Sequence, residues 1–230
     1  MAKRFFVTGT DTEVGKTFAS CALLAAAQKQ GLATIGLKPF AAGGEEQGGK
    51  LVNEDAIALQ QAASIKLPYE QVNPVLLNAA TSPHIAAHLE GRQISVGRVQ
   101  GIVQGALMQR HDFAIVEGAG GWRVPVSPRE SVADLARQLA YPVILVVGLR
   151  LGCINHALLT VEAIARDGLP LAGWIANSIS PEPMNFEREY LDTLKAAINA
   201  PLIGHLPFNQ EARNNPELLA ESVNLSCLNL

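Results

Sequence analysis

Short apolar runs alternate with longer amphipathic stretches along most of the chain. Six runs are predicted to be strands: RFFVTG at 4–9, TIGLKPF at 34–40, FAIVEG at 113–118, PVILVVG at 142–148, LAGWIAN at 171–177 and LIGHLPF at 202–208. Helical spacing predicts helices between them at 15–30, 54–63, 95–110, 131–140, 154–167 and 186–198. Strands that are apolar on both faces and separated by helices are typical of a parallel sheet covered on both sides. The pattern therefore predicts an α/β, doubly wound fold with a mainly parallel sheet.

The length and composition favour one domain. The chain has 230 residues, of which 48% are hydrophobic, so we expect a single core and a single domain over residues 1–230. One stretch departs from the alternation, because AAGGEEQGGKLVN at 41–53 is rich in glycine and charge. We expect it to be a flexible loop within the domain rather than a linker between domains.

Charge and cysteine content argue against several classes of protein. The formal net charge is −3 and the basic residues are scattered, so no nucleic acid partner is expected. The longest apolar run, VILVVGL at 143–149, is far too short to cross a bilayer, so no membrane partner is expected. The three cysteines form no CxxC pair, and the first strand follows directly on MAKR, which leaves no room for a signal peptide. We therefore expect a cytoplasmic protein.

The first predicted strand runs into a glycine-rich turn that suggests a phosphate-binding loop. In VTGTDTEVGKT at 7–17, five residues separate Gly9 from Gly15, Lys16 and Thr17, whereas the usual loop has four. The turn lies between a strand and a helix, where backbone N–H groups and the helix N-terminus bind phosphate. Lys16 would reach the outer phosphates, and the Thr17 hydroxyl would bind Mg²⁺. The alternative is a turn that binds no ligand, and Gly-Lys-Thr at this position favours the nucleotide site.

Polar side chains also lie at the carboxyl ends of other predicted strands, where such sheets bind their ligands. Lys38 points toward the same cleft as Lys16, and it would stabilise a phosphoryl-transfer transition state. Glu117 follows FAIV in the position of a metal-holding acid, and Asp55 is a candidate second carboxylate for Mg²⁺. Asn177 ends the GWIAN run. The alternatives are solvent-facing side chains for Lys38 and Glu117, and an ordinary first-turn helix acid for Asp55.

A histidine pair and a cysteine could in principle form a metal site and a nucleophile, but a structural role is favoured for each. His84 and His88 are one helical turn apart, a spacing that can hold a metal, but no third ligand follows at a suitable distance. A surface or packed pair is therefore favoured. Cys153 lies in LGCINH at a predicted helix start, and a nucleophile would need a base that the sequence does not indicate. We expect Cys153 to be a small packing residue.

Five segments, in order along the chain, resemble the dethiobiotin synthetase family. They are GTDTEVGKT at 9–17, KPF at 38–40, EGAGGW at 117–122, LGCINH at 151–156 and WIAN at 174–177. The resemblance runs from residue 3 to about 207 and weakens only in the last twenty residues or so. The longer phosphate loop is this family's own form of the motif. The resemblance thus implies a P-loop NTPase-like fold that uses ATP and Mg²⁺.

The activity implied by the resemblance is a ligase reaction of biotin biosynthesis. The enzyme would close 7,8-diaminononanoate with CO₂ and ATP to dethiobiotin, through a carbamate that is phosphorylated to a mixed anhydride and then attacked by the second amine. Lys38 is implied as the catalytic lysine, with Lys16 and Thr12 beside the reacting groups. The implied nucleotide-binding residues are Glu13, Val14, Gly15, Lys16, Thr17, Phe18, Asp55, Glu117, Gly118, Ala119, Gly120, Asn177, Leu206, Pro207 and Phe208, of which Thr17, Asp55 and Glu117 direct Mg²⁺.

The resemblance further implies a homodimer in which the two subunits share each site. The segment from Gly152 to Asn155, which includes Cys153, would reach the partner's substrate with its helix N-terminus. Tyr190 would meet the carboxylate tail of the substrate. The implied partners are small molecules, 7,8-diaminononanoate and CO₂ or bicarbonate. One position departs from the family, because KPFAAGG places Ala42 where serine is common, so a hydroxyl near the diamine is missing.

Two other functions are compatible with this fold. A switch ATPase of the partitioning and septum-positioning kind would respond to DNA, a membrane or a protein partner. Members of that group carry a phosphate loop with an extra signature lysine. This chain has no lysine between Thr8 and Gly15. An ATP-dependent amidase of the cobyrinate type would need a glutaminase domain, which we do not expect in this chain. The sequence favours the synthetase over both.

Overall fold

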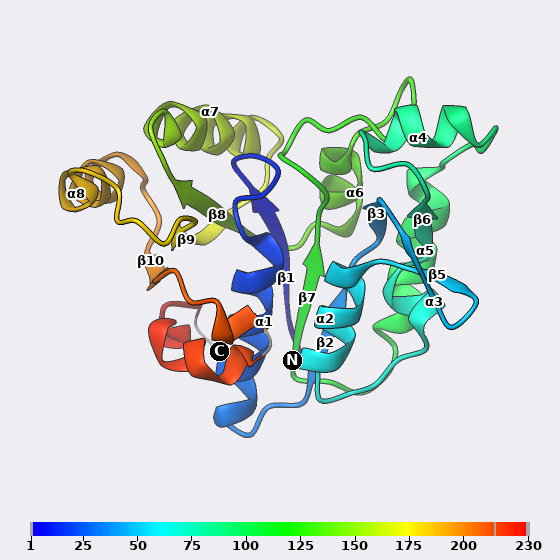
Figure 1. Ribbon diagram of the computed structural model, residues 1–230, viewed down its shortest axis with the longest axis horizontal. Helices are drawn as coiled ribbons and strands as arrows, with labels where there is room; N and C mark the ends of the chain where they lie inside the picture. Colours follow the sequence, from blue (N-terminus) through cyan, green and yellow to red (C-terminus); the bar gives the residue numbers. More distant parts are fainter. Residues whose placement is uncertain (1, 214, 229–230) are drawn as a thin grey trace.

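A parallel six-stranded sheet forms the centre of the computed structural model, which describes residues 2–213 and 215–228 (Figure 1). The strands lie in the order β10-β9-β8-β1-β7-β2, and each neighbouring pair is parallel. Their bounds are β1 Lys3–Gly9, β2 Thr34–Leu37, β7 Phe113–Glu117, β8 Val143–Leu149, β9 Leu171–Ser178 and β10 Leu202–Leu206. These are the strands that the apolar runs predict, so the doubly wound α/β fold is confirmed.

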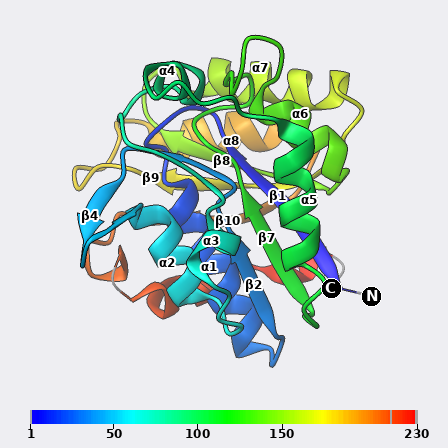
Figure 2. The same cartoon turned by 90° about the vertical axis from the view of Figure 1, so that its right-hand side faces the viewer.

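Helices cover both faces of the sheet, because successive strand residues point to opposite sides. Phe5 and Val7 of β1 pack with helix α1 (Lys16–Lys29), whereas Phe6 packs on the other side. That other side is covered by α5 (Val96–Ala106), α6 (Val132–Leu139), α7 (Cys153–Arg166) and α8 (Glu187–Ala197). Figure 2 shows the sheet between the two helical layers.

The strand order changes direction beside β1. The chain leaves β1 through α1 to β2, inserts β7 between these two strands, and later places β8 on the other side of β1. Loops that follow β1, β7 and β8 therefore meet at the carboxyl ends of adjacent strands, and in Figure 1 the loop after β1 stands at this edge. Doubly wound sheets bind their ligands at such a point.

The expectation that 41–53 lacks regular structure is wrong. Strand β3 (Phe40–Ala42) pairs with β6 (Val75–Leu77), and β4 (Glu45–Gln47) forms a hairpin with β5 (Lys50–Val52). Gly48 and Gly49 form the turn of this hairpin, with φ of 59° and 77°. These glycines supply positive φ for a tight turn, so glycine here is a requirement of the hairpin and not a sign of flexibility. Asn53 then caps α2 (Glu54–Ala62) by accepting a hydrogen bond from the backbone N–H of Ala56.

The sequence does not predict several short elements. They are α3 (Tyr69–Val72), α4 (Pro83–Leu89), β3 to β6, and the 3₁₀ helices η1 (Glu211–Arg213), η2 (Pro216–Ser222) and η3 (Leu225–Leu228). Such elements are too short to show a period, and their stability comes from packing. Leu219 and Leu225 are buried in the same cluster as α1, so the C-terminal turns cover the helix of the phosphate loop. Within the described ranges, no helix has the length and apolar character needed to span a membrane.

Candidate active site

The loop between β1 and α1 has the backbone of an anion-binding site. Helix α1 begins after Gly15, which has φ of 84°, and no side chain caps its first N–H groups. Such uncapped N–H groups and the helix dipole attract phosphate. Glu13 has φ of 58°, a strained conformation of the kind that clusters at ligand sites. A Cβ at Gly15 would lie 2.1 Å from Asn177 Nδ2, so the close approach of β9 to the loop requires glycine there.

Four side chains form a charged cluster at the ends of β2 and β7, namely Thr17, Lys38, Asp55 and Glu117. Lys38 Nζ lies 2.5 Å from Glu117 Oε1 and 2.9 Å from Asp55 Oδ2. The Thr17 hydroxyl donates to Glu117 Oε1 at 2.7 Å. Lys38 is 4% exposed and Glu117 is fully buried, so the ion pair between them is shielded from water. The predicted meeting of these four residues is therefore found in the structure.

The two lysines of the site have opposite pKa shifts. Burial alone would lower the pKa of Lys38, but the carboxylates of Glu117 and Asp55 raise it above its ordinary value. Burial and the neighbouring charge of Lys38 lower the pKa of Lys16 to about 8. Burial would raise the pKa of Asp55, and its contact with Lys38 holds it below its ordinary value. Lys38 and Asp55 are therefore charged at neutral pH, whereas Lys16 loses its proton more easily.

The oxygen atoms of the charged cluster fit a magnesium ion. Glu117 Oε2 is buried and has no hydrogen-bond partner among the described residues, which leaves a carboxylate oxygen available to a cation. The Thr17 hydroxyl and the Asp55 carboxylate are hard oxygen ligands of the kind that Mg²⁺ prefers, together with water and phosphate oxygens. Within residues 2–213 and 215–228, no cluster of three or more His, Cys, Asp or Glu could hold a metal ion. The Asp55 and Glu117 carboxylates are enough for Mg²⁺, which needs only one or two carboxylates.

Beside the phosphate loop lies a cavity of about 80 Å³, here called the small cavity. Asn177 donates from Nδ2 to the backbone oxygen of Val14 at 2.9 Å, which joins β9 to the loop. Its other side-chain atom, Oδ1, is buried and has no partner among the described residues. Asn177 thus brings a buried, unpaired oxygen to the wall of a cavity that Phe18 and Phe208 also line. Its lining residues are Glu13, Gly15, Phe18, Asn177, Ser178, Ile179, Phe208 and Asn209.

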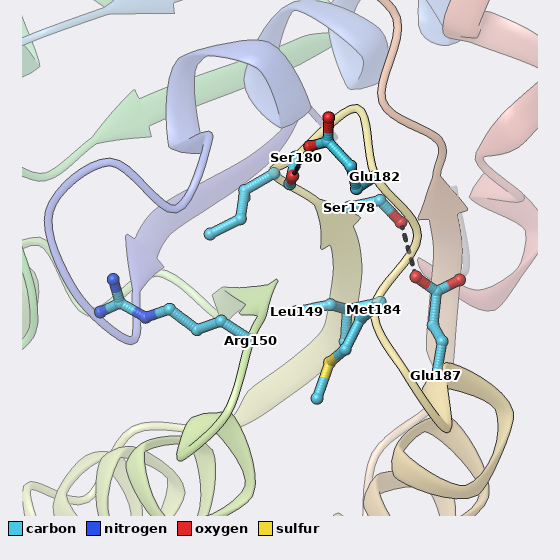
Figure 3. Close-up of a pocket in the computed structure, with 8 residues that line it drawn as sticks. Leu149, Arg150, Ser178, Ser180, Glu182, Met184 and Glu187 are labelled. Carbon is cyan, nitrogen blue, oxygen red and sulfur yellow. Dashed lines mark hydrogen bonds between the residues drawn. The ribbon is translucent and has the colours of Figure 1, made fainter.

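A second cavity of about 350 Å³, here called the large cavity, lies between the ends of β8 and β9 and the start of α8 (Figure 3). Met184 and Leu149 form apolar surface, and Glu187 lies at one side of the cavity (Figure 3). Ser178 and Ile179 line both cavities, so these two residues form a shared wall.

Some of the other residues implied for nucleotide binding lie near the phosphate loop or the small cavity, and others do not. Gly120 lies near the loop after β1, because a Cβ there would be 3.4 Å from Thr12 Oγ1. Gly118 packs between Val132 and Phe6, and Ala119 between them is partly buried. Phe208 lines the small cavity, as expected. Leu206 is fully buried in β10 and Pro207 is exposed, and neither lines the small cavity.

The residues implied for substrate binding lie on separate elements. Gly152 is the N-cap of α7, with φ of 91° and no side-chain cap, and Asn155 is exposed in the first turn. Tyr190 of α8 packs partly buried against the cluster that contains Cys153. Ala42 ends β3 opposite Leu77 and is partly buried. The uncapped start of α7 is a chemically suitable carboxylate site, and the roles of these residues stay predictions.

The histidine pair and the cysteine have the environments expected from the sequence. His84 and His88 both lie on α4 and are partly buried or exposed. His84 Nδ1 lies 2.9 Å from the Ser82 hydroxyl. Cys153 is 1% exposed and packs in an apolar cluster, so its role as a packing residue is confirmed.

Sequence patterns gave no signal for three polar contacts around the site. Arg150, at the end of β8, pairs with Asp11 of the phosphate loop. Trp122 donates from Nε1 to Asp167 Oδ2 at 2.7 Å and ties the loop after β7 to the end of α7. A third group joins β9, β10 and α8 and is described below. Each contact joins residues that lie nine or more positions apart, so periodicity could not find them.

The fold resembles those of solved P-loop ATPases. The septum site-determining protein MinD from Pyrococcus horikoshii OT3, solved with Mg-ADP, has a TM-score of 0.57 at 16% identity, over 95% of this chain and 86% of that one. A ParA family ATPase from Chlorobium tepidum TLS has a TM-score of 0.58 at 16% identity, over all of both chains. Identity this low shows a shared fold only, and it confirms the P-loop NTPase-like architecture.

Sequence comparison is more specific. A family model described as an AAA domain matches residues 3–216. The ATP-dependent dethiobiotin synthetase BioD of Cellvibrio japonicus (strain Ueda107) is 54% identical over 205 residues, which is 89% of each chain. The ATP-dependent dethiobiotin synthetase BioD 1 of Escherichia coli O157:H7 is 50% identical over 230 residues, 99% of this chain and 100% of its own. The chain therefore belongs to the family of ATP-dependent dethiobiotin synthetases.

Proposed function

We propose that this chain converts 7,8-diaminononanoate, CO₂ and ATP into dethiobiotin, ADP and phosphate. The observation that carries the proposal is the buried cluster of Lys38, Asp55, Glu117 and Thr17 beside the phosphate loop. It supplies a cation and two carboxylates at the point where the γ-phosphate of ATP would lie. Membership of the synthetase family supports this choice of substrate.

The residues that would hold ATP come from both sides of β1. The free N–H groups at the start of α1 and the Lys16 ammonium suit the phosphates. The unused Asn177 Oδ1 in the small cavity suits a base that carries an amino group, as adenine does. Thr17, Asp55 and Glu117 would hold Mg²⁺, which neutralises phosphate charge when bound.

The reaction would proceed in two chemical steps after carbamate formation. A carbamate oxygen attacks the γ-phosphorus, the bond to the β-phosphate oxygen breaks, and ADP leaves. The second amine then attacks the carbamate carbon, the bond to the phosphate oxygen breaks, and phosphate leaves as the ring closes. Lys38 would stabilise the charge that develops on the transferred phosphoryl group, and its raised pKa keeps it cationic for this role. Thr12 would contact the substrate at the opening of the loop.

The chain would act as a homodimer in which each site uses residues of both subunits. The uncapped helix start at Gly152 and the exposed Asn155 suit recognition of a carboxylate presented by the other subunit's site. Tyr190 would contact the same carboxylate. A reducing cytoplasm suits the free thiols of Cys21 and Cys153.

The activity is tested by measuring ADP release with each component left out in turn. We expect turnover only when ATP, Mg²⁺, bicarbonate and 7,8-diaminononanoate are all present, because the phosphoryl acceptor exists only as the carbamate. Equal ADP release without the diamine would contradict the synthetase function. Stimulation by DNA, vesicles or a protein in place of the diamine would instead indicate a switch ATPase, whose fold this chain shares.

The shared site is tested by mixing two damaged proteins, Lys16→Ala and Asn155→Trp, under conditions in which subunits exchange. If the two residues serve one site from different chains, each heterodimer has one intact site and one doubly damaged site. Random exchange then restores about a quarter of wild-type activity. Verified heterodimers without activity would reject the shared site and leave the ATP chemistry untouched.

A further inference from the structure

Three side chains from three elements form a polar group at the edge of the sheet formed by β9 and β10. Ser178 ends β9, His205 lies in β10, and Glu187 begins α8. His205 Nε2 lies 3.0 Å from Ser178 Oγ and 3.5 Å from Glu187 Oε1. The Ser178 hydroxyl can donate to Glu187 Oε2 at 3.3 Å, as the dashed line in Figure 3 shows. We call this group the wall triad.

The wall triad includes part of the surface that separates the two cavities, and its Glu187 also lines the large cavity. Ser178 and the adjacent Ile179 line both the small and the large cavity. Ser178 also follows Asn177, which lines the small cavity and whose buried Oδ1 has no partner among the described residues. His205 pairs in register with Ala176. A change in the triad therefore acts first on the residues that line the small cavity.

The segment that joins Ser178 to α8 ends at a helix N-terminus without a side-chain cap. Phe186, the N-cap of α8, has φ of 60° and makes no side-chain capping bond. Its later turns are held by apolar packing, since Leu194 is fully buried and Ile198 is 3% exposed. The packed end of α8 is thus a rigid support, and Glu187 is the polar link from it to the sheet.

We propose that His205 and Glu187 are positioning residues that hold Ser178 and Ile179 in place and thereby set the affinity of the small cavity for the base of ATP. With His205 in the tautomer that carries a proton on Nε2, the geometry gives one continuous path: His205 Nε2–H donates to Ser178 Oγ, and the Ser178 hydroxyl donates to Glu187. None of the three needs to contact phosphate or Mg²⁺. The proposal rests on the proposed nucleotide site, and it concerns binding rather than chemistry.

The test measures binding of ATP and of ADP directly, without diamine or bicarbonate. His205→Leu is expected to weaken both nucleotides about fivefold, the effect of one lost hydrogen bond. His205→Gln restores a donor near the Nε2 position and should bind within about twofold of wild type, because one hydrogen bond is regained. His88→Leu, on exposed α4, is the matched control and should leave binding unchanged.

The path itself is tested by a double-mutant cycle. Ser178→Ala removes the central hydroxyl with little change in volume, so His205→Leu and Ser178→Ala together should bind no more weakly than the weaker single variant. Turnover at saturating ATP should stay near wild type for all these variants, so the change falls on KM for ATP and not on kcat. Glu189→Gln, an exposed acid on the same helix, serves as the control for Glu187→Gln.

Two results would overturn the proposal. One is unchanged ATP and ADP affinity in correctly folded His205→Leu and Ser178→Ala proteins. The other is fully additive losses in the double variant, which would show that the two residues act separately. The proposed reaction is judged by the component-dependence of ADP release, so failure of that assay with intact nucleotide binding would leave the wall triad supported.

Discussion

At the ends of β1, β2 and β7 the site carries buried charges, whereas at the ends of β9 and β10 it carries mainly neutral polar groups. The first region, here called the phosphate side, contains Lys16 at 7% exposure, Lys38 at 4% and the fully buried Glu117. The second, the base side, contains Asn177 at 4% exposure and the half-buried wall triad. The difference suits the proposed ligand, ATP, because a polyphosphate is bound by charge and a base by shape and a few hydrogen bonds.

Burial also determines what each side loses on mutation. Removing Lys38 from the phosphate side leaves the buried Glu117 carboxylate unpaired away from water, and this costs several kcal/mol. A residue removed from the base side costs about one hydrogen bond, on the order of 1 kcal/mol. Mutations on the phosphate side should therefore affect both chemistry and stability, and mutations on the base side should affect affinity alone.

Lys38→Met is expected to have the largest effect. Turnover should fall about 100- to 1,000-fold, as for loss of one preorganised transition-state contact, while ATP affinity changes by only a few-fold. The free energy of unfolding should also fall by about 3 kcal/mol because Glu117 and Asp55 lose their counter-charge. Steady-state kinetics, direct ATP binding and urea unfolding measure the three quantities. Lys29→Met, on the surface of α1, is the control, and parallel loss of ATP binding and turnover would contradict the assignment of Lys38 to catalysis.

Asn177→Ala should produce an intermediate effect on the base side. ATP affinity is expected to fall about tenfold, a little more than one hydrogen bond, because the side chain also holds the Val14 carbonyl. Discrimination against GTP should shrink, since guanine has a carbonyl where adenine has an amino group. Competition binding with ATP and GTP measures both values, with exposed Gln71→Ala as the control. A variant that keeps full preference for ATP would place base recognition elsewhere.

Ala42→Ser addresses the departure from the family at the end of β3. The restored hydroxyl should tighten diamine binding by about 1 kcal/mol, the net value of one hydrogen bond. The KM for the diamine measures this change, and the affinity for ATP is the internal control. Unchanged diamine affinity would show that this part of the site has adapted in another way.

Asp134→Ala is expected to affect stability alone, because it lies in α6 and belongs to neither side of the site. Asp134 forms a capping box with Ser131, so its loss should cost about 1 kcal/mol of unfolding free energy. Burial alone would raise the pKa of Asp134, but hydrogen bonds from Ser131 and the charge of Arg137 lower it below its ordinary value. The contribution is therefore present at neutral pH and disappears as the pH falls through that lowered pKa. Urea unfolding across acidic pH checks this, and an altered ATP affinity would contradict the separation of α6 from the site.

Much of the phosphate side could be predicted from the sequence. The Gly-Lys-Thr turn, Lys38 after its strand and Glu117 after FAIV all stand next to clear apolar runs. Parallel strands bring their carboxyl ends to one edge, so local patterns are enough to place these groups together. The base side was predicted less fully, because Asn177 was identified but the wall triad was not.

Local sequence patterns are enough to predict the six central strands, their long helices and the chemistry of the phosphate loop. Each of these depends on local periodicity or on a motif whose residues are neighbours in the chain. The folded structure is needed to show which carboxylates pair with Lys38, how 41–53 folds into a hairpin, and how His205 of β10 meets Glu187 of α8. These contacts depend on distances between elements far apart in sequence, and such distances are fixed by packing of the whole core.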